Sequence, residues 1–171
     1  MSYKKQREWS ALFMPSVKSI LGKVIIIEST FKEDTEEGFD LITPEQKRIA
    51  CRVRDYERYK KYIQEFTIRS QSYHNRKTEI DKIIQEKRGD WMFYGFTKGN
   101  EVIYWSIINL DVFRSNHKSA HYKERKNLDG TKFRAYSMGS FPQNIIISTN
   151  IDIQFGLEKV SQYLLPFPTH R

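Results

Sequence analysis

Cysteine is almost absent from this chain. Cys51 is the only one among 171 residues, so an internal disulfide and a paired C-x-x-C zinc motif are both excluded. It stands within the alternating apolar pattern of residues 48–54 (RIACRVR). That position predicts a buried free thiol in a reducing compartment, with a nucleophilic thiol as the alternative.

Long hydrophobic runs are also missing. The longest, residues 24–27 (VIII), is far too short to span a bilayer. The basic N-terminus (MSYKKQREW) is not followed by an apolar segment of signal-peptide length, and residues 1–8 read as a polar, flexible arm. We therefore expect a cytoplasmic protein with no membrane partner.

Three common catalytic motifs are absent: the P-loop, the dinucleotide-binding G-x-G-x-x-G and the hydrolase G-x-S-x-G. What the chain has in excess is positive charge. Its 29 Lys and Arg against 21 Asp and Glu give a net charge of +8 and a pI of about 9.5. This balance favours a polyanionic partner, with nucleic acid ahead of a membrane surface.

The length and an apolar fraction of 39% predict one globular domain over residues 1–171. Thr78 is a suitable N-cap, and Lys98, Gly99 and Asn100 form a hairpin turn signal. Hydrophobic periodicity predicts, in chain order, helix 9–21, strands 38–43, 48–54 and 65–70, helix 79–86, strands 91–97, 101–110, 133–138 and 144–148, and helix 157–165. The expected fold is α+β (α/β), a central mixed β-sheet flanked by helices.

Arginines dominate one face of two predicted strands, residues 48–54 and 65–70 (EFTIRS). Successive strand residues point to opposite faces, so Arg52, Arg54 and Arg69 are expected to crowd one side of a single sheet. Like charges crowd where an anion compensates them. The candidates are the acidic stretch 33–40 and a phosphate backbone, whose oxygens match the guanidinium fork.

Further candidates for nucleic-acid contact lie between and after these strands. Tyrosines alternate with cations along residues 56–62 (YERYKKY), and aromatic rings beside positive charge suit stacked bases and phosphates. Arg76 and Lys77 precede a predicted helix start that can face an anion. The alternative for Lys77 and its neighbours is an ordinary N-cap with an acidic first turn.

Six segments carry a resemblance to a known group: GFDLI, RIACRVR, EFTIRS, KTEIDKI, GDWMFYGF and WSIINLDVF. They resemble a family of bacteriophage-encoded proteins associated with the PD-(D/E)XK, restriction-endonuclease-like nuclease fold, over about residues 12–150. The order helix, strand hairpin, further strand and helix is similar to that nuclease core. The resemblance implies a DNA-binding hydrolase in the host cytoplasm, an Mg²⁺- or Mn²⁺-dependent phosphodiesterase.

The resemblance also implies site residues. Asp40 matches the strand aspartate of that family and Glu28 its helix glutamate, so both are expected to hold the metal. Where the family has (D/E)-x-K, this chain has Ala50-Cys51-Arg52 or Arg52-Val53-Arg54, without a carboxylate. The missing acid would have to come from elsewhere, and Glu79, Asp81 and Asp34 are candidates.

Two functions stay open from the sequence. The first is a nuclease in which Asp40, Glu28 and Glu79 hold one divalent ion while Arg52, Arg54 and Arg69 hold phosphates. The second is a module without metal chemistry that binds nucleic acid or a host protein. A structural protein that uses its basic face for assembly is a third, weaker interpretation. Nothing in the sequence indicates an oligomeric state.

Overall fold

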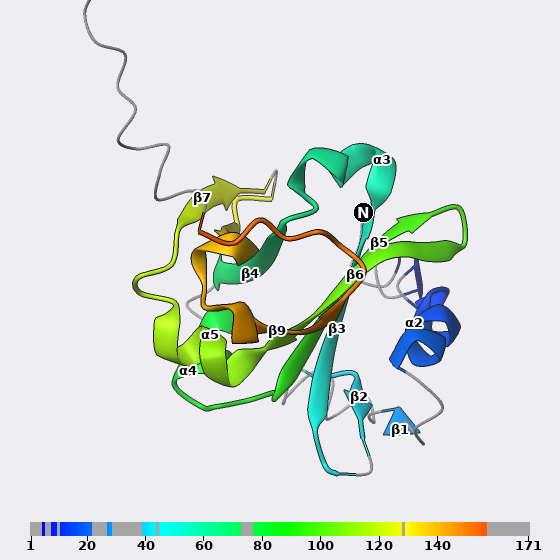
Figure 1. The fold of residues 1–171 in the computed structure, drawn as a ribbon, viewed down its shortest axis with the longest axis horizontal. Helices are drawn as coiled ribbons and strands as arrows, with labels where there is room; N and C mark the ends of the chain where they lie inside the picture. The colour runs from blue at the N-terminus through cyan, green and yellow to red at the C-terminus, as the bar shows by residue number, and fades with distance from the viewer. Residues whose placement is uncertain are drawn as a thin grey trace, which may run out of the picture.

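The chain folds into two β-sheets with helices against them, as the computed structural model in Figure 1 shows. The structure describes residues 5, 8, 9, 11–21, 27, 28, 39–43, 45–72, 77–127 and 129–156. In chain order its principal elements are α2 (Met14–Leu21), β1 (Ile27–Glu28), β2 (Leu41–Ile42), β3 (Arg48–Asp55), α3 (Tyr56–Tyr59), η2 (Lys60–Tyr62), β4 (Glu65–Gln71), α4 (Glu79–Ile84), β5 (Trp91–Lys98), β6 (Glu101–Asn109), α5 (Leu110–Asn116), β7 (Tyr122–Lys126), β8 (Lys132–Ser137), η4 (Met138–Ser140), η5 (Gln143–Ile145) and β9 (Ile146–Thr149).

The larger sheet is six-stranded and mixed, in the order β1-β2-β3-β5-β6-β9. Its two predicted hairpins are confirmed: β2 pairs antiparallel with β3, and β5 with β6. Gly99, in the second turn, has a φ of 59°, a left-handed conformation that glycine adopts without strain. Strands β3 and β5 are parallel, joined by a crossover that contains α4. The expected α+β domain with a central mixed sheet and flanking helices is thus confirmed.

One prediction about this sheet is wrong. Strand β4 was expected in the same sheet as β3, but it belongs to a second, three-stranded sheet of order β4-β8-β7. The place beside β3 is taken by β5, six of whose eight residues are buried. A strand that is apolar on both faces suits the centre of a covered sheet better than β4, which alternates buried Phe66 and Ile68 with more exposed residues.

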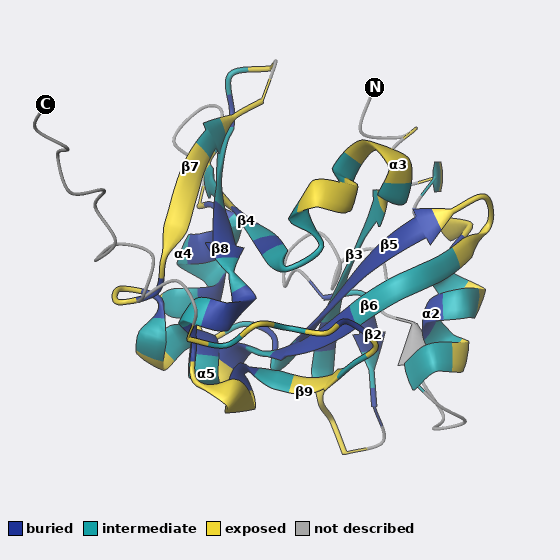
Figure 2. Ribbon diagram, turned by 45° about the horizontal axis from the view of Figure 1, so that its top comes forward, coloured by how far each residue is buried: buried dark blue, intermediate teal, exposed yellow. Residues whose placement is uncertain are grey.

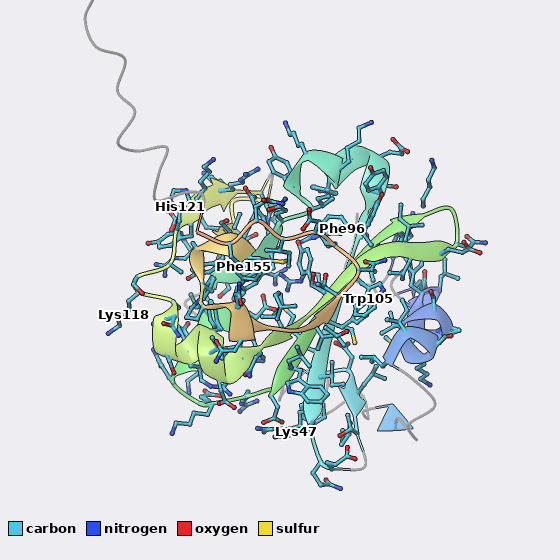
Figure 3. All side chains as sticks on the ribbon, in the orientation of Figure 1. Lys47, Phe96, Trp105, Lys118, His121 and Phe155 are labelled. Carbon is cyan, nitrogen blue, oxygen red and sulfur yellow. The ribbon has the colours of Figure 1, made fainter. Side chains whose placement is uncertain are left out.

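Two hydrophobic clusters occupy the two faces of the larger sheet. One includes Phe93 and Trp105 and is covered by α2. The other includes Phe96 and lies between the larger sheet, the smaller sheet, α4 and α5. Figure 2 shows the buried central strands, and Figure 3 labels Phe96 and Trp105, which belong to opposite faces.

Local signals explain several helix ends. Thr78 caps α4 as predicted: its hydroxyl accepts the Asp81 N–H, and the Asp81 carboxylate accepts the Thr78 N–H in return. Helix α2 starts at Met14, so Pro15 occupies its first turn, where proline is tolerated. The predicted helix 157–165 lies outside the described residues. No helix in the described part of the chain is both long and apolar enough to cross a membrane.

Candidate nucleic-acid interface

Arg52 and Arg54 project from the face of β3 that looks toward β4. In register they stand beside Tyr94 and Phe96 of β5, on the side of the larger sheet that meets the smaller one. The alternation predicted for residues 48–54 is therefore correct. The two guanidiniums nevertheless have different partners.

Arg52 is neutralised by a carboxylate. Its Nη2 lies 2.7 Å from both oxygens of Glu79, and its Nη1 donates to the backbone carbonyl of Thr67. Burial lowers the pKa of Arg52, but the charges of Glu79, Tyr94 and Asp40 outweigh it, so the pKa lies above its ordinary value. This is a half-buried structural ion pair that joins β3, β4 and α4.

Arg54 is held by neutral hydroxyls. Its Nη2 donates to Thr67 Oγ1 at 3.0 Å, its Nε approaches the Tyr94 hydroxyl at 3.4 Å, and its guanidinium lies 5.7 Å from the centre of the Tyr59 ring. The two hydroxyls are themselves 3.2 Å apart. No carboxylate of the described residues forms an ion pair with Arg54, although its side chain is half-buried. Its positive charge is therefore uncompensated within that part of the chain.

The smaller sheet turns a basic face toward Arg54. Cross-strand register places Arg69 of β4 and Arg125 of β7 on either side of Phe133 in β8. Arg69 is exposed, and Phe133 is half-buried. Arg125 pairs with Glu65 at 3.2 Å. Arg69 thus lies on the same face of β4 as Thr67, which binds Arg54. The prediction that all three arginines crowd one side of a single sheet is wrong, because β3 and β4 belong to different sheets.

Two tyrosines of the α3–η2 segment complete the opposite wall. The Tyr62 ring lies 4.1 Å from the Arg125 guanidinium and 4.9 Å from the Lys61 ammonium. Hydrogen bonds from Lys61 and then Arg125 lower the pKa of the Tyr62 hydroxyl. Tyr59 lies against Arg58 as well as Arg54. These cation–π contacts orient the rings around a positively charged opening.

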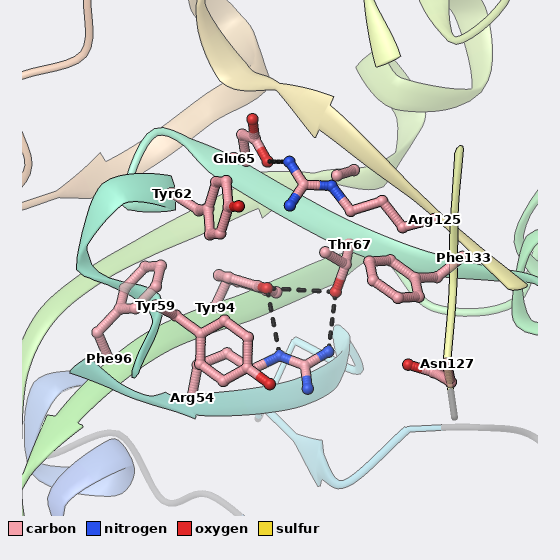
Figure 4. A pocket seen from close by; sticks show the side chains of 11 residues that line it. Arg54, Tyr59, Tyr62, Glu65, Thr67, Tyr94, Phe96, Arg125, Asn127 and Phe133 are labelled. Atoms are coloured by element: carbon pink, nitrogen blue, oxygen red, sulfur yellow. Dashed lines mark hydrogen bonds and ion pairs between the residues drawn. The ribbon is translucent and has the colours of Figure 1, made fainter. Parts of the chain in front are cut away.

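These walls enclose a pocket of about 470 Å³, counted out to its open mouth (Figure 4). Arg54, Thr67 and Tyr94 form its hydrogen-bonded floor, with Phe133 and Arg125 on the side of the smaller sheet. We call this the β3–β8 pocket. Its lining residues are Arg54, Tyr59, Tyr62, Glu65, Thr67, Tyr94, Phe96, Arg125, Asn127, Phe133 and Ala135.

The predicted metal ligands are engaged elsewhere. Both oxygens of Glu79 bind Arg52, and one of them also accepts the Arg69 N–H at 2.8 Å. The Asp40 carboxylate accepts the backbone N–H of Cys51 in β3. Strand β2 is too short to pair with this part of β3, so the side chain takes the place of a strand partner. Burial and the Asp40 charge raise the pKa of the Cys51 thiol, so it stays protonated.

Divalent magnesium requires several oxygen ligands around one point. Among the described residues, no three His, Cys, Asp or Glu side chains are grouped to hold a metal. Asp40 and Glu79 as placed do not fit such an ion. Glu28 is described only in its backbone, in β1, so its predicted metal role stays a prediction.

The two remaining predicted contacts lie apart from the pocket or outside the described chain. Lys77 is exposed and pairs with Glu86 at 2.5 Å, so it belongs to the surface of α4. Arg76 lies outside the described residues. Their role in nucleic-acid binding stays a prediction.

Sequence reasoning predicted β8 as a strand but missed β7 and the contribution of both strands to the site. Arg125 and Asn127 line the pocket together with Phe133, yet they occur in a stretch that reads only as polar and basic. A signal was present: the turn at Asp129 and Gly130 separates two alternating segments. Strand β7 carries so few apolar residues that hydrophobic periodicity does not reveal it.

Comparisons of the chain with known protein families, curated proteins and solved structures found no match. Its function has to be inferred from the geometry of the site.

Proposed function

We propose that this protein binds nucleic acid at the β3–β8 pocket and the basic surface around it. The observation that carries the proposal is Arg54. Its guanidinium is half-buried and is held by hydroxyls, without a carboxylate partner in the described chain. The free-energy cost of removing it from water is therefore not offset by an opposite charge. A phosphate at this point would supply the missing charge and accept its hydrogen bonds.

The surroundings favour a polymer over a single small anion. Exposed cations lie on both sides of the pocket, with Lys60 and Lys61 on η2 and Lys123 on the Arg125 face of β7. Together with exposed Arg69 they extend the positive surface beyond the space that one phosphate fills. Such a role fits the cytoplasm, the compartment that the single free thiol also favours.

The test is binding of a fluorescently labelled DNA oligonucleotide at low salt, measured by anisotropy. Arg54→Met should weaken binding about tenfold, since a charge-assisted hydrogen bond contributes roughly 1.5–3 kcal/mol. Arg48→Met is the matched control because Arg48 lies on the same strand but pairs with Asp90 at 3.2 Å. Equal losses in the two variants would mean that only net charge matters, and no binding by the native protein would end the proposal.

A second candidate is metal-dependent DNA cleavage. It is favoured by one topological observation: helix α2 precedes the β2–β3 hairpin, which has Asp40 at its start, as in the nuclease core that the sequence resembles. The further strand of that order, β4, lies in the other sheet. Plasmid DNA incubated with Mg²⁺ or Mn²⁺ tests it. Nicking that is lost in Asp40→Ala would support cleavage, and nicking equal to that variant would leave a module that only binds.

A further inference from the structure

We propose that the β3–β8 pocket accepts one unpaired nucleotide of a single strand, with a phosphate at Arg54 and the base against Phe133. This inference rests on the proposed function and adds the form of nucleic acid that is bound. Three features carry it: a free guanidinium position, an aromatic wall with an open face, and a lining that reaches buried side chains.

The phosphate position follows from the hydrogen bonds of Arg54. Nε and Nη2 are directed at the Tyr94 and Thr67 hydroxyls, while Nη1 has no hydrogen-bond partner among the described residues. Thr67 and Tyr94 are hydroxyl groups, which can donate as well as accept. All three side chains can therefore donate to the same phosphate oxygens without leaving the floor of the pocket.

The base position follows from Phe133. Within the described chain its ring makes no contact with another aromatic ring, in contrast to Phe66, which packs against three. It is half-buried in the pocket wall, between Arg69 and Arg125 in register. Tyr59 and Tyr62 form the facing wall (Figure 4). A base between these walls meets aromatic carbon on both sides, which suits any of the common bases.

The preference for a single strand follows from the depth of the site. The residues that line the pocket include Tyr94 and Phe96, which are both buried. Bases of a duplex are stacked inside the helix, so one could reach Phe133 only after leaving the stack at a cost of a few kcal/mol. A flexible single strand can insert a base without breaking pairs.

The test compares one labelled oligonucleotide as a single strand and as a duplex, with native protein and the variant Phe133→Leu. Leucine keeps an apolar side chain there but removes the ring. Single-strand affinity should fall about tenfold, the size of effect that loss of one stacking contact gives, while duplex affinity changes less than twofold. Circular dichroism verifies folding, and Tyr59→Leu is the second variant if Phe133→Leu does not fold.

Tyr122→Leu is the matched control, an exposed aromatic on the same sheet that packs against Tyr136 on the opposite face. It should leave both affinities unchanged. Equal affinity for the two forms, or no effect of Phe133→Leu and Tyr59→Leu, would overturn this inference and leave the proposed function standing. If neither form binds at low salt, the proposed function itself fails.

Discussion

Two arginines on one strand face have different roles in this protein. Arg52 and Arg54 are two residues apart, so alternation places both toward the smaller sheet. Arg52 meets Glu79, whereas Arg54 meets only the hydroxyls of Thr67 and Tyr94 and the ring of Tyr59. Among the described residues, Arg52 has a carboxylate partner and Arg54 has none, and this difference is why we assign the proposed phosphate contact to Arg54.

We expect Glu79→Gln to lower the free energy of unfolding by about 1–3 kcal/mol, because it leaves a half-buried guanidinium without its opposite charge. The measurement is urea denaturation at neutral pH. DNA affinity should not fall, since Glu79 contributes no positive charge.

Glu57→Gln is the control for this prediction. Glu57 is exposed and pairs with Lys60 and Lys98 at 3.4 and 3.6 Å, so its loss should cost less than about 0.5 kcal/mol. Equal destabilisation by the two variants would show that the Arg52–Glu79 pair contributes no more than a surface pair.

At the scale of single elements, short helices depend on their ends. Helix α4 has six residues, too few to be stable alone, and its first turn is fixed by the reciprocal bonds between Thr78 and Asp81. Hydrogen bonds from the Thr78 N–H and then from its hydroxyl lower the pKa of Asp81 below its ordinary value of 3.8. This helix also presents Glu79 to Arg52, so its cap supports the ion pair beside the pocket.

Thr78→Ala should reduce the free energy of unfolding by about 1 kcal/mol at neutral pH. Because the folded pKa of Asp81 lies below the unfolded value, the stability that its charge contributes is present above about pH 3.8 and is lost as pH falls through the folded pKa. The difference between native protein and variant should therefore shrink in acid. Denaturation at several pH values measures it.

Thr78→Ser is the control, because serine keeps the hydroxyl that bonds Asp81. A difference between native protein and Thr78→Ala that stays constant from neutral pH into acid would contradict the role given to the Asp81 charge.

The elements also show how far the sequence predicts this fold. Period-two and helical patterns identified β2, β3, β4, β5, β6, β8 and α4, since each has a regular apolar pattern. For β4 they gave the strand but not its sheet, because partner choice depends on competition with the more apolar β5. They failed for α5, which begins with the Asn109 cap and buries Leu110 and Phe113 where the sequence continues a strand. Seven residues that line the pocket come from β3, the α3–η2 segment, β4 and β5, and four come from residues 125–135. No local sequence pattern specifies that these distant segments lie side by side.

At the scale of the whole molecule, the net charge of +8 acts through the basic surface around the pocket. A chain with this excess attracts polyanions at long range and loses that attraction as salt rises. The acidic residues of the described chain are largely taken up in local pairs, such as Glu86 with Lys77 and Asp90 with Arg48. Lys61 on η2 and Lys123 on β7 form no ion pair with a described residue and add positive charge on the two sides of the pocket.

Binding to a single strand should weaken linearly on a plot of log affinity against log salt concentration. Three to five phosphate contacts would give a slope of about −2 to −3.5, at roughly 0.7 per phosphate. Arg54→Met should make the slope shallower by about 0.7, and Arg48→Met should leave it unchanged. Affinity that does not depend on salt would contradict phosphate recognition.

The two faces of the larger sheet also separate the chain's fluorophores. Trp91 and Trp105 belong to the cluster beneath α2, and Trp9 packs edge-on against Phe13, with ring centroids 4.9 Å apart. These are all three tryptophans of the chain. The β3–β8 pocket has none, but three tyrosines line it. Selective excitation of tryptophan should thus follow detachment of α2 during unfolding while staying insensitive to ligand, whereas tyrosine emission should respond to occupancy of the pocket.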